Sequence, residues 1–60
     1  MITKDMTIGE VLSKKAGAAD ILINFGMGCV GCPSAQAETI EEAAMVHGIN
    51  LEELMKKLND

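Results

Sequence analysis

The chain has 60 residues and a mass of 6.4 kDa, a length that suits one small domain and excludes a Rossmann unit, a thioredoxin fold or a large substrate cleft. Acidic residues outnumber basic ones by nine to five, and the net charge is −4, which argues against proteins that bind nucleic acid or anionic membranes. Hydrophobic residues make up 48% of the chain, too many for a disordered protein. We therefore expect residues 1–60 to form a single globular domain.

The first helix is predicted directly after Thr7. The segment Thr7-Ile8-Gly9-Glu10 matches a capping box, in which the threonine and the glutamate three residues later each bond the other's backbone. Apolar residues then recur on one helical face, and Gly17 is predicted to end this helix in a left-handed conformation. The face comprises Ile8, Val11 and Leu12.

A second helix is predicted from Ala18 to Phe25, with Gly26 as its terminator. Its apolar residues have the i, i+3, i+4, i+7 spacing of a helix that packs one face on a core. These residues are Ala18, Ile21, Leu22 and Phe25.

The same pattern recurs in the second half. Thr39-Ile40-Glu41-Glu42 is another capping box, and Gly48 is the predicted terminator. The apolar stripe of this helix is predicted at Ile40, Ala43, Ala44 and His47.

Asn50 is predicted to cap a last helix, whose acidic residues stand at its start and whose Lys56 and Lys57 stand near its end, as the helix dipole favours. Its apolar stripe is Leu51, Leu54, Met55 and Leu58. No segment alternates with the period of two that marks a strand. The predicted fold is all-α, a compact array of four to five short helices with glycine-terminated turns.

The chemistry of the chain is concentrated between the two halves, in Cys29-Val30-Gly31-Cys32. A disulfide across so short a loop adds little stability, so its expected value is that it can form and break without unfolding the domain. Pro33 suits the first position of a helix, which makes Cys32 a candidate N-cap where backbone amides favour a thiolate. The less enclosed Cys29 is the alternative nucleophile. Gly28, Gly31 and Pro33 are the predicted supporting residues of the motif.

A metal site is the main alternative, because zinc and iron–sulfur clusters also take CxxC pairs. A mononuclear site needs about four ligands, and the chain offers Cys29, Cys32 and His47. A homodimer could supply four thiolates from two motifs. The third interpretation is a pure interaction domain in which the cysteines are inert.

Other candidate residues have structural interpretations first. His47 is expected at a helix end, against the dipole and the core, with ligation or proton transfer as its second interpretation. Met27, Met45 and Met55 are expected as core filler. The acidic cluster of Glu38, Glu41 and Glu42 is expected as a solvated helix start, and Ser34 has no evident base to activate it.

Three segments together resemble the hybrid-cluster-protein-associated redox disulfide domain, and the likeness extends over nearly all of the chain. They are Phe25-Gly26-Met27-Gly28-Cys29-Val30-Gly31-Cys32-Pro33, Glu38-Thr39-Ile40-Glu41-Glu42-Ala43-Ala44 and His47-Gly48-Ile49. The resemblance implies a small helical array with a redox disulfide at Cys29 and Cys32, found alongside iron–sulfur–oxygen enzymes. The chain departs from the family at Ala16-Gly17-Ala18, where a proline is expected in the turn.

The expected function is that of a thiol–disulfide redox mini-protein, a disulfide oxidoreductase if it turns over, acting on a redox or iron–sulfur protein partner. No cofactor is expected in this interpretation, whereas the alternative scaffold would hold zinc or an iron–sulfur cluster. The longest apolar run is Ile21-Leu22-Ile23, and the start of the chain lacks the basic and apolar regions of a signal peptide. We expect a cytoplasmic protein, where paired cysteines are more often chemical than structural.

Overall fold

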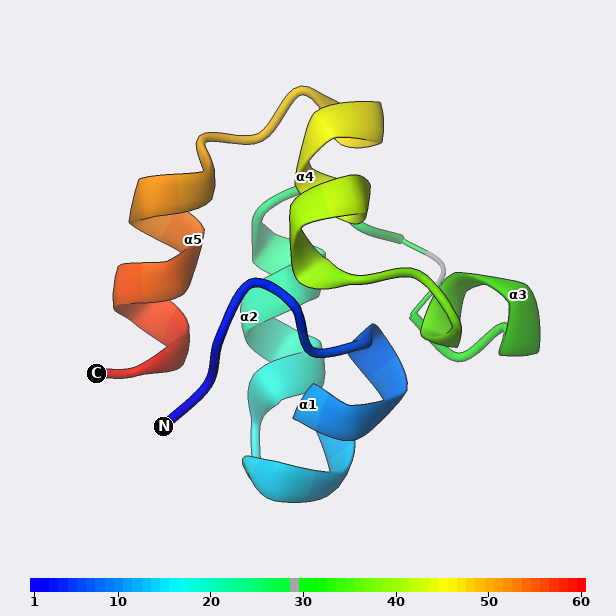
Figure 1. Ribbon diagram of the computed structural model, residues 1–60, viewed down its shortest axis with the longest axis horizontal. Helices are drawn as coiled ribbons and strands as arrows, with labels where there is room; N and C mark the ends of the chain where they lie inside the picture. Colours follow the sequence, from blue (N-terminus) through cyan, green and yellow to red (C-terminus); the bar gives the residue numbers. More distant parts are fainter. Residues whose placement is uncertain (29) are drawn as a thin grey trace.

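The computed structural model describes residues 1–28 and 30–60, and this part of the chain contains helices and no named strand (Figure 1). The all-α prediction is confirmed. In chain order the helices are α1 (Ile8–Lys14), α2 (Ala18–Asn24), α3 (Pro33–Gln36), α4 (Ile40–His47) and α5 (Leu51–Leu58). α1 packs against α2 and α3, and α5 packs against α2 and α4.

Both predicted capping boxes form. The Thr7 hydroxyl accepts the Glu10 backbone N–H at 3.2 Å, while the Glu10 carboxylate accepts the Thr7 backbone N–H at 3.0 Å. Thr39 and Glu42 repeat this arrangement at the start of α4. These bonds satisfy amide groups that a helix start otherwise leaves without partners.

The two capping boxes also lie side by side, joined by an isolated antiparallel bridge between Thr7 and Thr39. The Ile8 N–H donates to the Glu38 carbonyl at 2.8 Å, and the Ile40 N–H donates to the Met6 carbonyl at 3.0 Å. The starts of α1 and α4 are therefore fixed against each other by backbone, which holds the two halves of the chain together.

Gly17 has the left-handed conformation that was predicted, with φ at 83°, but it has a different role. It is the N-cap of α2, whereas α1 already ends at Lys14 with Lys15 extended as its C-cap. The chain passes from α1 to α2 through residues 15–17, and of the two cap residues only Gly17 has a positive φ. The glycine therefore belongs to the start of α2 and not to the end of α1.

The stops at Gly26 and Gly48 are confirmed. Each glycine has a positive φ, and the residue after it bonds back to a carbonyl five residues earlier. The Met27 N–H donates to the Leu22 carbonyl at 3.0 Å, and α2 ends at Asn24 with Phe25 as its C-cap, one residue short of the prediction. This is the Schellman arrangement, which turns the chain sharply towards the cysteine motif.

The core takes residues from every helix except the short α3. Val11, Leu22, Ile40 and Leu54 are completely buried, and Ala18, Ala43, Ala44 and Leu58 fill the spaces between them. The predicted stripes of α1, α2 and α5 all face this core.

Two predictions about α4 are wrong. His47 is exposed rather than on the buried stripe, and Met45 is 78% exposed instead of filling the core. The buried face of α4 ends at Ala44, and after the stop at Gly48 it is Ile49 that packs against the core. Met27 is buried and Met55 is half-buried, as expected.

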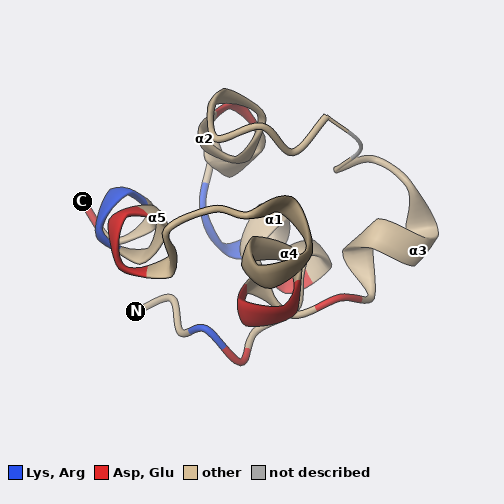
Figure 2. Ribbon diagram, turned by 90° about the horizontal axis from the view of Figure 1, so that it is seen from above, with Lys and Arg blue, Asp and Glu red and all other residues tan. Residues whose placement is uncertain are grey.

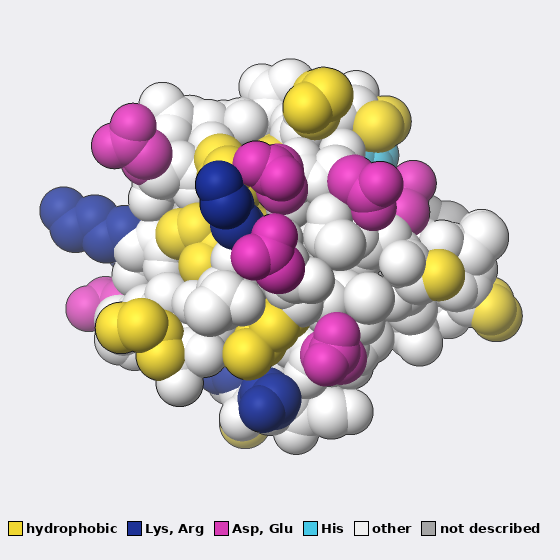
Figure 3. Space-filling model, viewed as in Figure 1, with side chains coloured by type: hydrophobic (Ala, Val, Ile, Leu, Met, Phe, Trp, Pro, Cys, Tyr) yellow, Lys and Arg dark blue, Asp and Glu magenta, His cyan; other side chains and the backbone are white. Residues whose placement is uncertain are grey.

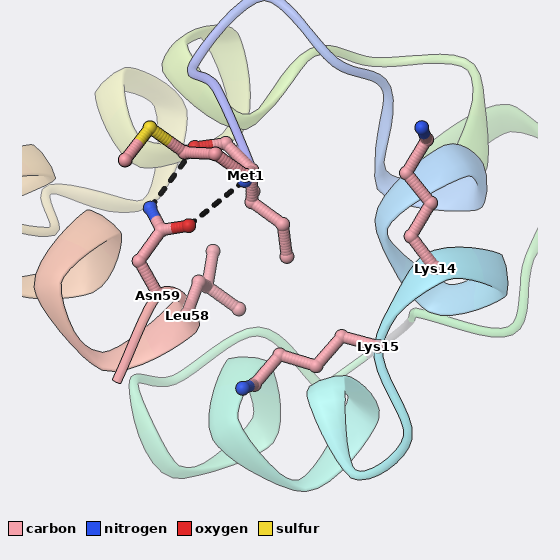
Figure 4. Close-up of a pocket in the computed structure, with 6 residues that line it drawn as sticks. Met1, Lys14, Lys15, Leu58 and Asn59 are labelled. Carbon is pink, nitrogen blue, oxygen red and sulfur yellow. Dashed lines mark hydrogen bonds between the residues drawn. The ribbon is translucent and has the colours of Figure 1, made fainter.

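The two ends of the chain lie side by side (Figure 1). Asn59 joins them: its amide oxygen accepts the Ile2 N–H at 2.8 Å, and its amide nitrogen donates to the Ile2 carbonyl at 2.9 Å (Figure 4). Ile2 is thereby buried, at 7% exposure. Among the described helices none is long and apolar enough to cross a bilayer.

Candidate functional site

Cys32 is the N-cap of α3, and Pro33 occupies the first position of the helix, as predicted. Proline suits this position because its missing N–H would have no helical partner, and its fixed φ is already helical. The Gln36 N–H donates to the Cys32 carbonyl at 2.9 Å, which closes the single turn. The local sequence thus places the Cys32 sulfur at the amino end of a helix.

Cys32 is half-buried and is a disulfide-bonded cysteine rather than a thiol. Cys29 lies outside the described residues, so the predicted pairing of the two cysteines stays a prediction. The residue between them that faces inward is Val30, at 9% exposure. Val30 belongs to the hydrophobic core, and it anchors the motif to the rest of the domain.

Gly28 and Gly31, predicted as supporting residues, are both exposed. Neither has a positive φ, and a Cβ built at either position meets no described atom within 4 Å. Their conformation and their surroundings would therefore accept alanine. Glycine leaves the backbone at these two positions without a side chain to cover it.

Gln36 is a site residue that the sequence analysis missed. Its side-chain amide donates to the Val30 carbonyl at 3.1 Å, so α3 holds the middle of the CxxC segment. α3 in turn lies on α1 at Gly9, where a Cβ would stand 3.4 Å from the Cβ and the carbonyl oxygen of Gln36. The available signal was its spacing, because Gln36 follows the N-cap by about one helical turn.

A small crevice of about 30 Å³ lies against the inner side of the motif. Val30 and Met27 line it together with Glu38 and His47. Glu38 is half-buried there instead of being a solvated residue of a helix start. The sequence spacing did not predict that His47 and Glu38 lie at the same crevice, because His47 is the last residue of α4.

The motif lies in a segment without charged side chains. No Asp, Glu, Lys or Arg occurs from residue 21 to residue 37, so α3 and the segment leading into it carry no such charge (Figure 2). Hydrophobic side chains and the single histidine are also visible at the surface (Figure 3), and Met45 and Val46, which precede His47 in α4, are 78% and 71% exposed. Four of the nine acidic residues stand in the first turns of α4 and α5.

The larger hollows of the described residues are lined by other parts of the chain than the cysteine motif. One of about 390 Å³ is lined by Phe25 and the charged end of α5, and one of about 250 Å³ lies between the chain ends and Lys14 and Lys15 (Figure 4). A small-molecule substrate is normally held in a concave pocket beside the reacting group. The described part of the motif offers only the narrow crevice.

Within residues 1–28 and 30–60, no three His, Cys, Asp or Glu side chains are grouped as a metal ion would need. His47 and Val30 line the same crevice, and Cys29 lies outside the described residues. The metal interpretation, which uses Cys29 and Cys32 together, is therefore left untested by this arrangement.

Comparison with known proteins gives relatives without an assigned activity. The sequence model of the family described as "Domain of unknown function (DUF1858)" matches residues 2–55. A solution structure from Clostridium thermocellum is 54% identical, with a TM-score of 0.81, over 95% of this chain and 81% of that one. A solution structure of an uncharacterised protein from Methanocaldococcus jannaschii is 41% identical, with a TM-score of 0.88, over 97% of this chain and 80% of that one. No curated protein matches the chain.

Proposed function

The chain belongs to the DUF1858 family, and we propose that this member is a thiol–disulfide exchange protein that uses Cys29 and Cys32. The observation that carries the proposal is the position of Cys32, a disulfide-bonded cysteine at the N-cap of α3 directly before Pro33. When that sulfur is reduced, the free N–H groups of the first turn favour its thiolate, which is the reactive form.

The proposed reaction moves two electrons and two protons between the domain and a partner protein. In one direction, a thiolate of the reduced domain attacks one sulfur of a partner disulfide. The partner S–S bond breaks, and the displaced partner thiolate takes up a proton. The second cysteine of the domain, having lost its proton, attacks the mixed disulfide and releases the other partner thiolate, which is protonated in turn. The domain ends as a disulfide and the partner as a dithiol.

Three features of the described residues support a protein as the partner. The described part of the motif adjoins a narrow crevice, its two glycines are exposed, and its segment carries no charge. The choice of a redox or iron–sulfur protein, such as a hybrid-cluster enzyme, rests on the sequence resemblance. We also place the protein in the cytoplasm, where a reducing environment lets such a pair cycle.

Native mass spectrometry on protein purified without oxygen or added thiol tests the proposal. We expect a metal-free chain that loses about 2 Da on mild oxidation and regains it with a reductant, as a reversible disulfide requires. A matched sample in which both thiols have been alkylated should show no such change.

The same spectra separate the alternatives. Bound zinc, iron or sulfide, above all in a dimer, would show that the cysteines are ligands and would overturn the redox proposal. A mass that does not respond to oxidant would favour an interaction domain with inert cysteines. In that case alkylation should leave partner binding unchanged.

A further inference from the structure

Gln36 holds the central peptide of the CxxC segment. Its side-chain nitrogen donates to the Val30 carbonyl, at 3.1 Å, and that carbonyl belongs to the peptide between Val30 and Gly31. Val30 is buried and the bond to its carbonyl is partly buried, so the loss of that bond would cost free energy. The amide of Gln36 supplies that partner.

Gln36 is itself held firmly in place. Its backbone N–H donates to the Cys32 carbonyl within α3, and its Cβ and carbonyl oxygen pack closely against Gly9 of α1. One residue thus contacts the N-cap cysteine through its backbone and the middle of the motif through its side chain. A movement of the loop between Cys29 and Cys32 must break or stretch the bond to Val30.

We infer that Gln36 is a positioning residue that sets the reduction potential of the proposed Cys29/Cys32 couple by stabilising the loop in its disulfide form. The inference rests on the proposed function. The bond from Gln36 to Val30 occurs in a structure in which Cys32 is disulfide-bonded. Reduction removes the covalent link that restrains the loop, so we expect the bond to contribute more to the disulfide form than to the dithiol form.

Two substitutions of Gln36 by residues of nearly the same size should change the reduction equilibrium to different extents. Gln36→Met keeps the length and helix propensity of the side chain but removes the donor. Gln36→Glu places a carboxylate opposite the Val30 carbonyl at pH 7, where two acceptors face each other. Both should make the disulfide easier to reduce, and Gln36→Glu more so than Gln36→Met.

Equilibration with oxidised and reduced glutathione at pH 7, followed by alkylation and mass analysis, measures this directly. We expect the equilibrium constant for reduction to rise roughly threefold to tenfold, where tenfold equals about 30 mV for a two-electron couple. Asn59→Leu is the matched control. It removes a bond of the same type, from a side-chain amide to the Ile2 carbonyl, together with the other two Asn59 side-chain bonds, to the Ile2 N–H and the Met55 carbonyl. These bonds lie at the chain ends, away from α3 (Figure 1). It should lower the melting temperature and leave the redox equilibrium unchanged.

The inference fails if both folded Gln36 variants keep the wild-type equilibrium, or if Asn59→Leu shifts it by as much as they do. Should Gln36→Glu not fold, as judged by circular dichroism, the comparison of Gln36→Met with wild type decides. A wild-type protein that shows no reversible loss of about 2 Da overturns the proposed function instead. A wild-type protein that exchanges normally while the variants match it overturns only the role of Gln36.

Discussion

Cys32 occupies a position for which serine is the better residue. Serine is among the preferred N-cap residues, because its hydroxyl accepts a backbone N–H of the first turn, whereas a cysteine sulfur is a weak acceptor. Cys32→Ser should therefore leave α3 and the fold intact while it abolishes thiol exchange. Cys29→Ser is the matched variant at the other end of the motif and should also abolish exchange.

Far-ultraviolet circular dichroism and reduction of a small disulfide substrate measure the two properties separately. Loss of helicity in both serine variants would show that the cysteines have a structural or metal-binding role. Exchange that persists in one variant would identify the remaining cysteine as sufficient on its own.

Glu10 is a carboxyl group whose titration is expected to change the stability of the fold with pH. Hydrogen bonds from the Thr7 backbone N–H and hydroxyl, with a smaller contribution from Lys14, hold the pKa of Glu10 below its ordinary value of 4.5. A carboxyl group with a lowered pKa in the folded state stabilises the fold above its ordinary pKa. That stability is lost as the pH falls through the lowered pKa.

Glu10→Gln should therefore have a flatter stability profile than wild type below pH 4.5, since glutamine still accepts the Thr7 N–H but does not titrate. Urea unfolding between neutral pH and pH 3 compares the two proteins. An NMR titration of wild type gives an independent check, and a Glu10 that titrates at or above 4.5 would contradict the prediction.

At the scale of the element, the starts of α1 and α4 are stabilised twice, by their own capping boxes and by the backbone bridge between them. Thr39→Ala removes only the first. The hydroxyl that accepts the Glu42 N–H is lost, while the Ile40 N–H still donates to the Met6 carbonyl. We expect a loss of about 1 kcal/mol in the free energy of unfolding, within the range of single caps.

Thr7→Ala should cost a similar amount, and the double variant should lose about the sum, because the backbone bridge remains in all three. Thr39→Ser, which keeps the hydroxyl, should stay close to wild type in the same chemical denaturation experiment. A double variant that loses far more than the sum would show that the side chains also hold the bridge together.

At the scale of the whole molecule, local sequence patterns predicted the helices but not the long-range hydrogen bonds that connect distant parts of the chain. Capping boxes, apolar stripes and the stops at Gly26 and Gly48 involve residues within one or two turns of each other, so the sequence displays them directly. The bond of Asn59 to Ile2 spans 57 positions, and the bridge from Thr7 to Thr39 joins the two halves. No periodicity encodes such pairings.

The candidate site divides in the same way. Cys32 and Pro33 were placed correctly because capping is local, and Gln36 lies within the same short segment. His47, by contrast, comes to the motif only through the packing of α4. His47 was placed on a buried stripe because helical spacing shows which residues share a face but not how far along the helix that face is covered.

A redox cycle requires that the whole domain remain folded when the sulfurs are reduced. The buried core is built mainly from the apolar faces of α1, α2, α4 and α5, and Cys32 is not among its residues. Closing the four-residue loop from Cys29 to Cys32 lowers the entropy of the unfolded chain by an amount worth only about 2 kcal/mol in the loop-entropy model.

We expect the reduced protein to keep its helical circular dichroism and dispersed amide NMR spectrum, and to melt cooperatively at a lower temperature than the oxidised protein. The Cys29→Ser/Cys32→Ser double variant should melt close to the reduced form, because neither has the cross-link. If reduction instead unfolds the domain, the disulfide is a structural element, and it cannot serve as the exchangeable couple that the position of Cys32 supports.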